Sequence, residues 1–176
     1  MANAEMRVVR HNLTHGDAPH GLSDELVPHA VFTHPQIASA GLTEQEARRR
    51  DIDHIVAVSE YADVAYGWAL EDTTGFVKLL ADPQRRTLVG VHIIGPQAAT
   101  LLQPMVQAMM LGQTIDQLAH EVLYVHPALP EILEQTLIEL ASQHPNGKTD
   151  RQRNDDGLGG EFNITPKPNG GQKPRP

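Results

Sequence analysis

The strongest constraint on the fold is a pair of β-patterned segments separated by five residues. Residues 75–81 and 87–94 are rich in Val, Leu and Ile, and both are typical of strands. Residues 82–86 between them include Asp and Pro, which favour turns. Because so short a connection suits a hairpin and not a crossover, the two strands are expected to pair antiparallel.

The remaining pattern places helices beside this sheet. Strands are also predicted at residues 28–33 and 52–60, and helices at residues 5–14, 43–50, 97–111, 114–119 and 131–141. Thr43 and Glu46 have the spacing of a capping box, and Pro104 is expected to kink its helix or to mark where the helix begins. This order of elements predicts an α+β fold in which helices pack on an antiparallel sheet.

The composition argues against several classes of protein. A formal net charge of −8 without a basic stripe argues against a nucleic-acid or anionic membrane surface. No apolar run approaches the roughly 20 residues that span a bilayer, and the first residues lack the apolar part of a signal peptide. Cysteine is absent, which excludes a disulfide, a thiol nucleophile and a cysteine zinc site within this chain. We therefore expect a cytoplasmic protein.

One histidine and one glutamate have the spacing of a proton-transfer pair. His126 and Glu131 are separated by a segment with Pro127 and Pro130, which stiffen the backbone. Pro130 suits the first position of a helix, so Glu131 is expected in its first turn. A carboxylate placed there can accept a hydrogen bond from one imidazole nitrogen and leave the other to move a proton. The alternative is a solvated histidine beside a glutamate that faces the helix dipole.

Three histidines near the N-terminus are candidate metal ligands. His11 and His15 would lie one helical turn apart, and His20 follows in a polar stretch. No carboxylate or cysteine completes a ligand set, so we interpret them as part of a helix and a solvated loop and predict no metal site.

Residues 61–74 are predicted to be irregular and hold three aromatic side chains, Tyr61, Tyr66 and Trp68. They form either a loop folded onto its own domain or a partner interface, where Tyr and Trp are enriched. We expect the apolar surface that includes Tyr66, Trp68 and the helix from Met105 to Met110 to drive self-association.

The composition changes near the C-terminus. Residues 143–176 are rich in Pro and Gly and hold almost no large apolar side chains, so they are predicted to be disordered. We divide the chain into residues 1–25 (helix and linker), residues 26–142 (one folded domain) and residues 143–176 (tail).

Taken together, the motifs resemble the C-terminal dimerisation domain of the pyridine nucleotide-disulfide oxidoreductases. Residues 31–44, Val-Phe-Thr-His-Pro-Gln-Ile-Ala-Ser-Ala-Gly-Leu-Thr-Glu, are similar to the segment that opens that domain. Residues 87–95 and the following helix resemble its central hairpin and helix, and residues 126–131 match the signature His-Pro-x-x-x-Glu. Residues 63–75 and 126–131 are similar, more narrowly, to members that reduce a mycothiol disulfide. Residues 1–13 resemble the end of a flavin-domain helix.

The resemblance implies a role in a homodimeric flavoenzyme. In such enzymes NADPH reduces FAD, the flavin reduces a cysteine pair, and that pair reduces a disulfide substrate. The resemblance implies that His126 is the acid/base that exchanges a proton with the thiol and that Glu131 holds its imidazole. It also implies that the backbone at His126 and Pro127 approaches the flavin of the partner subunit.

The chain departs from the family in what it lacks. It has neither the expected glycine-rich dinucleotide fingerprint nor a redox cysteine pair. We therefore expect the product of a truncated or split gene that holds no flavin when purified and is inactive in isolation. Two functions stay open: one half of an enzyme that works with a complementing flavin- and NADPH-binding chain, or a homodimerising module without catalysis.

Overall fold

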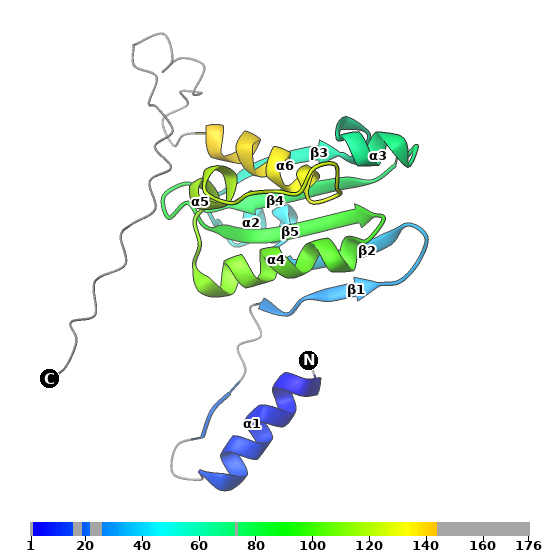
Figure 1. Ribbon diagram of the computed structural model, residues 1–176. Coiled ribbons are helices and arrows are strands. Elements are labelled where there is room, and N and C mark those ends of the chain that lie inside the picture. Colours follow the sequence, from blue (N-terminus) through cyan, green and yellow to red (C-terminus); the bar gives the residue numbers. More distant parts are fainter. Residues whose placement is uncertain (1, 16–18, 22–25, 73, 144–176) are drawn as a thin grey trace, which may run out of the picture.

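The computed structural model describes residues 2–15, 19–21, 26–72 and 74–143 (Figure 1). Its elements are, in chain order, α1 (Ala2–Thr14), β1 (His29–Val31), β2 (Gln36–Gly41), α2 (Glu44–Arg49), β3 (Ile55–Glu60), the 3₁₀ helix η2 (Tyr61–Asp63), α3 (Ala65–Ala69), β4 (Phe76–Ala81), β5 (Leu88–Gly95), α4 (Ala98–Leu111), α5 (Ile115–His120) and α6 (Glu131–Ser142). Apart from Gln143, the predicted tail lies outside the described residues. Helix α1 buries none of its residues and lies apart from the sheet in Figure 1.

The five described strands form one antiparallel sheet in the order β1-β2-β5-β4-β3. Strands β4 and β5 pair with each other from Phe76 opposite Ile94 onward, so the predicted hairpin is confirmed. Its turn is closed by the Asp82 carboxylate, whose Oδ1 accepts backbone hydrogen bonds from Gln84 at 2.8 Å and Arg85 at 2.9 Å. The predicted α+β class is therefore confirmed.

Strand β2 is not predicted by the sequence pattern. It consists mainly of small residues, which have a weak local preference for strands. It forms because its backbone is paired on both sides, with β1 and with β5. The side chains of Ala38 and Ala40 are buried, and their small size lets α4 pack closely against this part of the sheet. Pairing with neighbours thus outweighs local propensity here.

Helices α4 and α6 pack against the sheet, and α5 packs against α6 (Figure 1). Each helix places buried side chains at helical spacing: Leu101, Leu102, Met105 and Val106 from α4, and Ile132, Leu133, Leu137 and Leu140 from α6. Helix α4 begins at Ala98, so the alternative that it begins near Pro104 is wrong. Pro104 is exposed, and water can therefore reach the carbonyl that lacks its N–H partner.

Helix α2 lies over the opposite face of the sheet. Strand β4 shows this directly, because Val77 and Leu79 point into the core with α4 and α6, whereas Lys78 between them forms an ion pair with Glu44 of α2. The predicted capping box is confirmed: the Glu46 N–H donates to Thr43 Oγ1 at 3.1 Å, and the Thr43 N–H donates to Glu46 Oε2 at 3.0 Å.

The segment at residues 61–74 contains two short helices, η2 and α3, so the predicted irregular segment is wrong in this respect. Tyr61 is completely buried, and its hydroxyl donates to the Pro96 carbonyl at 2.9 Å. Burial raises the pKa of Tyr61. Trp68 of α3, by contrast, is 74% exposed. Tyr61 therefore anchors this segment to its own domain, while Trp68 faces outward.

Candidate functional site

The predicted site lies on the connection between α5 and α6, which is tied to the core at both ends. Tyr124 is half-buried, and its hydroxyl donates to the Leu118 carbonyl of α5 at 3.0 Å. Leu129, near the other end, is 2% exposed. His126 projects from the segment between these two anchors, and a cis peptide bond joins it to Pro127.

His126 and Glu131 are hydrogen-bonded, as the spacing predicts. Pro130 caps α6 with φ of −57°, so Glu131 is the first residue of the helix. The distance from His126 Nδ1 to Glu131 Oε1 is 2.5 Å. The second carboxylate oxygen, Oε2, accepts the backbone N–H of Ala128 at 2.9 Å. Each carboxylate oxygen of Glu131 thus takes part in one hydrogen bond, and the carboxylate links the loop that carries His126 to α6.

The two side chains of the pair differ in exposure: 70% for His126 and 17% for Glu131. The hydrogen bond from His126, and then that from the Ala128 N–H, hold the pKa of Glu131 below its ordinary value. A carboxylate that accepts from Nδ1–H selects the tautomer in which Nε2 is the free base. This arrangement can accept and return a proton at Nε2.

The lowered pKa of Glu131 predicts a pH-dependent contribution to stability. A carboxyl group with a depressed folded-state pKa stabilises the fold above its unfolded pKa of about 4.3, and this contribution is lost as pH falls through the folded value. Glu131→Gln is therefore expected to lower the urea midpoint at pH 7, with the difference from wild type shrinking as the pH falls below the unfolded pKa of about 4.3. Glu139→Gln, at an exposed position on α6, serves as the control. A difference that persists unchanged at pH 3 would contradict the assigned cause.

Sequence reasoning did not find two groups that shape this site. The Ala128 N–H is a backbone donor, and no residue type signals its use. Tyr124 is the half-buried residue in an exposed apolar run that includes Leu123, at 97% exposure, and Val125. An aromatic residue two positions before His126 was the available signal.

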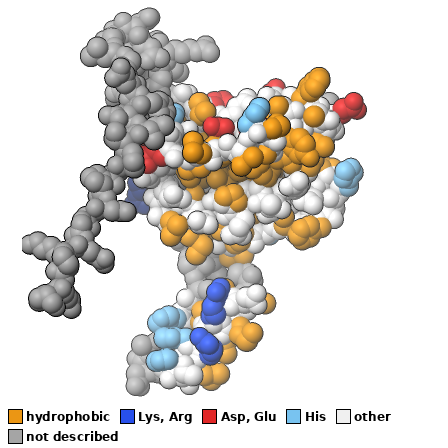
Figure 2. Space-filling view, in the orientation of Figure 1, with side chains coloured by type: hydrophobic (Ala, Val, Ile, Leu, Met, Phe, Trp, Pro, Cys, Tyr) orange, Lys and Arg blue, Asp and Glu red, His pale blue; other side chains and the backbone are white. Residues whose placement is uncertain are grey.

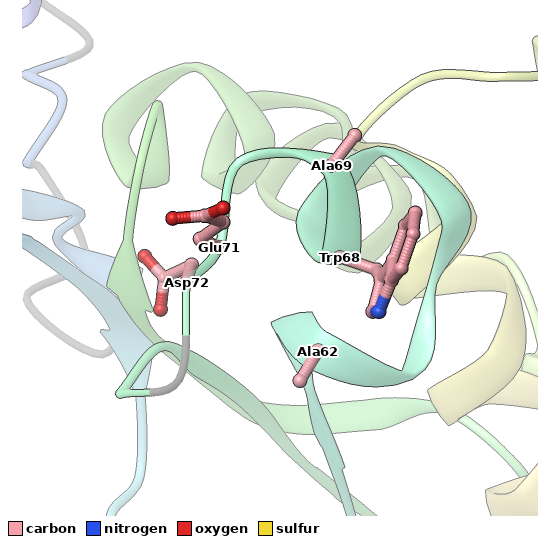
Figure 3. A pocket seen from close by; sticks show the side chains of 5 residues that line it. All are labelled: Ala62, Trp68, Ala69, Glu71 and Asp72. Atoms are coloured by element: carbon pink, nitrogen blue, oxygen red, sulfur yellow. The ribbon is translucent and has the colours of Figure 1, made fainter.

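Two hollows lie near α3. The first, of about 280 Å³, adjoins the pair and is lined by Asp63, Val64, Ala65, Glu131, Glu134, Gln135 and Ile138. The second, of about 320 Å³, is lined by Ala62, Trp68, Ala69, Glu71 and Asp72. Figure 3 shows the carboxylates of Glu71 and Asp72 on one side of the second hollow and the Trp68 indole on the other. Only the first contains a predicted site residue.

The predicted apolar surface is confirmed only in part. Trp68 is exposed and Tyr66 partly so, but Met105 is buried in the core and only Met110, near the end of α4, is well exposed. Further exposed apolar side chains are Leu70, Val122, Leu123, Val125 and Ile138. Figure 2 shows hydrophobic side chains gathered across the face that carries α4, α5 and α6. The exposed apolar surface therefore lies less on α4 than the sequence predicts, and more on α3 and the loop that carries His126.

The three N-terminal histidines lie together, although the sequence predicts a solvated loop for His20. The His11 ring centroid is 4.7 Å from that of His15 and 3.8 Å from that of His20. The Asn12 side chain ties His20 to α1, because it forms hydrogen bonds of 2.8 and 3.0 Å with the His20 backbone. Across the described ranges, no three His, Asp or Glu side chains are placed to hold a metal ion.

None of the helices in the described part of the chain is both long and apolar enough to cross a membrane.

Residues 27–137 match the family model described as "Pyridine nucleotide-disulphide oxidoreductase, dimerisation domain". The chain belongs to this family. The resemblance drawn from the motifs is thereby confirmed, and the antiparallel sheet with its helices is the dimerisation domain.

Two relatives show how much of a family member is present. Mycothione reductase from Mycobacterium tuberculosis is 46% identical over 144 residues, which cover 80% of this chain and 31% of the relative. Dihydrolipoyl dehydrogenase from Mycobacterium bovis is 37% identical over 110 residues, covering 62% of this chain and 24% of the relative. The chain thus spans less than a third of the length of either relative, and its similarity to the mycothione reductase is the greater of the two.

Two solved structures share the fold. LpdA from Mycobacterium tuberculosis has a TM-score of 0.68 at 22% identity, covering 75% of this chain and 28% of that protein. The flavoprotein disulfide reductase RclA from Escherichia coli has a TM-score of 0.66 at 24% identity, covering 74% and 30%. At these identities the comparison supports the fold of the dimerisation domain and not a substrate.

Proposed function

We propose that this dimerisation domain supplies the His126–Glu131 acid/base pair to a mycothione reductase-like enzyme that uses FAD and NADPH. One observation carries the proposal: Glu131 holds His126 Nδ1 at 2.5 Å while the imidazole remains 70% exposed. The greater identity to mycothione reductase than to dihydrolipoyl dehydrogenase supports a mycothiol disulfide as the substrate.

The proposed chemistry is proton transfer at His126 Nε2. A dithiol on another domain or chain loses a proton to Nε2, which gives a thiolate and an imidazolium. The thiolate attacks one sulfur of the substrate disulfide and forms a mixed disulfide, and the departing thiolate takes the proton back from Nε2. The second thiol of the pair then attacks the mixed disulfide and releases the other substrate thiolate, which takes up that thiol's proton. The dithiol is thereby oxidised to a disulfide and supplies both electrons. Glu131 stabilises the imidazolium during the interval in which it exists.

The described residues do not form a nucleotide-binding unit. All their strand pairs are antiparallel, whereas a dinucleotide site needs parallel strands joined through a helix. FAD and NADPH are therefore assigned to domains other than the one described. When bound there, FAD would supply the electrons that keep the dithiol reduced. On this chain, the backbone of the exposed residues His126 and Pro127 is the part proposed to lie against the flavin.

A chimera tests this function. In the mycothione reductase of Mycobacterium tuberculosis, the matching 144-residue region is replaced by the corresponding residues of this chain. We expect NADPH oxidation with mycothione as substrate, and none from the relative with that region deleted. The unfused chain is expected to show no turnover with added FAD and NADPH. A chimera that folds, dimerises and holds FAD but does not turn over would contradict the proposed role.

The second candidate function is a homodimerising module without catalysis, which the absence of cysteine favours. Upstream coding sequence separates the two candidates. An adjacent reading frame that encodes flavin and NADPH domains supports the split enzyme, whereas an unrelated upstream sequence supports the module.

Both candidates predict that the chain self-associates. The exposed Trp68 and Leu123 lie in the apolar surface near the His126 loop, and burying them against a second copy removes apolar area from water. Sedimentation velocity at tens of micromolar is expected to show a dimer that Leu123→Asp converts to monomer. Leu13→Asp, on the exposed face of α1, is the matched control and should leave the dimer intact. A wild-type monomer at this concentration would refute the prediction.

A further inference from the structure

Tyr124 occupies a distinct place in the segment that carries His126. Its neighbours Leu123 and Val125 are 97% and 70% exposed, and His126 itself projects outward. Tyr124 turns inward instead, packs against the hydrophobic core and donates its hydroxyl proton to the Leu118 carbonyl at 3.0 Å. The segment is thus tied to α5 by a side chain two residues before the proposed acid/base.

The other end of the segment is fixed independently. Leu129 is buried in the core, and Glu131 accepts the Ala128 N–H at 2.9 Å. The position of His126 Nδ1 relative to Glu131 Oε1 therefore depends on two anchored side chains, Tyr124 before His126 and Leu129 after it. Without the Tyr124 anchor, the residues just before His126 would all be exposed.

We propose that Tyr124 is a positioning residue that holds His126 in hydrogen-bonding range of Glu131. This inference rests on the proposed function, because it takes His126 as the acid/base. Tyr124 itself touches no reacting atom. Tyr124 acts on conformation: because it keeps the loop ordered before the reaction, the conformational entropy cost of ordering the loop does not add to the reaction barrier.

The environment of the phenol suits a fixed anchor. Burial, and to a lesser degree the charge of Glu134 on α6, raise the pKa of Tyr124 to about 12. The hydroxyl therefore stays protonated and donates throughout the neutral range. Tyr124 is thus bonded to α5, and the charge of Glu134 on α6 acts on its phenol.

Tyr124→Phe in the full 176-residue chain tests the proposal, because it removes only the hydroxyl. We expect amide hydrogen exchange at Ala128 to accelerate about tenfold, as for the loss of one intramolecular hydrogen bond in a local opening. We also expect the pKa of Glu131, followed by carboxyl ¹³C NMR, to rise toward its ordinary value. Tyr124→Leu, which also removes the ring, should exceed Tyr124→Phe in both measurements.

Tyr61→Phe is the matched control. It removes another phenol hydroxyl that donates to a backbone carbonyl, at 2.9 Å, but in a different part of the domain. When Tyr61→Phe and Tyr124→Phe lower the global stability equally, Tyr61→Phe should leave the amide exchange rate of Ala128 and the pKa of Glu131 unchanged. The proposal is overturned if Tyr124→Phe changes neither measurement, or if Tyr61→Phe reproduces its effects.

These readouts need no enzyme activity, so they separate this inference from the proposed function. In an active chimera, Tyr124→Phe should lower kcat with little change in KM. An inactive chimera together with the expected NMR changes would contradict the proton-transfer role and retain Tyr124 as the anchor of His126.

Discussion

Replacing His126 with glutamine in the chimera is expected to lower kcat by about 10²- to 10⁴-fold, the range typical of a lost general acid/base. Glutamine can still donate a hydrogen bond to Glu131, but it cannot take up or release a proton at neutral pH. Because the substrate disulfide does not need that proton to bind, KM should change little. Steady-state NADPH oxidation with mycothione measures both quantities.

Two further variants test whether the loss of kcat comes from the lost proton transfer at His126. Glu131→Gln keeps the imidazole but loses the carboxylate that orients it and stabilises its cationic form, so a smaller loss, about tenfold, is expected. His120→Gln, at an exposed position in the last turn of α5, should retain wild-type rates. If His126→Gln retained more than half of the wild-type kcat, the acid/base role would be wrong, whatever the geometry of the pair.

Gly90→Ala is expected to lower the free energy of unfolding by about 3 kcal/mol or more, which is large for a single added methyl group. A Cβ at this position would lie 2.0 Å from the carbonyl oxygen of Leu42. That carbonyl cannot easily move away, because the Leu42 N–H donates to the Val89 carbonyl at 2.8 Å. Gly90 also lies in β5, the middle strand of the sheet, so the strain cannot be relieved at an edge.

Thermal unfolding provides the measurement, and a decrease in Tm of about 10 °C corresponds to the expected loss. Gly21→Ala is the control, because no atom lies within 4 Å of its added Cβ. Its effect should stay within about 0.5 kcal/mol. Equal Tm values for the two variants would show that β5 can shift away from Leu42.

The elements that could be predicted from the sequence share one property: their determining contacts are short in sequence. The hairpin of β4 and β5 depends on a five-residue connection, and the capping box of α2 joins Thr43 to Glu46. The bond between His126 and Glu131 is of the same kind, since two prolines and the start of a helix bring the side chains together. Their role in proton transfer stays a prediction, as do the domain boundaries and the disordered tail.

Membership in the family could also be predicted from motifs, and the match at residues 27–137 confirms it. The chemistry of the whole enzyme is a different matter. No residue of this chain supplies the thiols, because cysteine is absent. In the proposed function, the flavin and the dithiol therefore belong to other parts of the enzyme.

The features that could not be predicted depend on contacts between distant residues. Strand β2 is stable because β5 pairs with it from 49 positions away (Gly41 opposite Gly90) to 59 positions away (Gln36 opposite Gly95), and its own residues carry little preference for a strand. Tyr61 is buried in a core built from distant elements, and its hydroxyl donates a hydrogen bond to the carbonyl of Pro96, 35 positions later. Whether an aromatic side chain lies in a core or faces solvent depends on which segments pack over it, and local pattern contains no information on that packing.

The pair at the site shows both kinds of cause. Local sequence accounts for the hydrogen bond, because His126 and Glu131 are five positions apart and the two prolines between them restrict the backbone conformations that would separate their side chains. Its setting depends on the assembled domain: Leu129 enters a core built from the whole sheet, and Tyr124 packs on that core and bonds to α5. The residue types follow from the chain alone, but the rigidity that a proton-transfer group needs comes from packing between elements far apart in sequence.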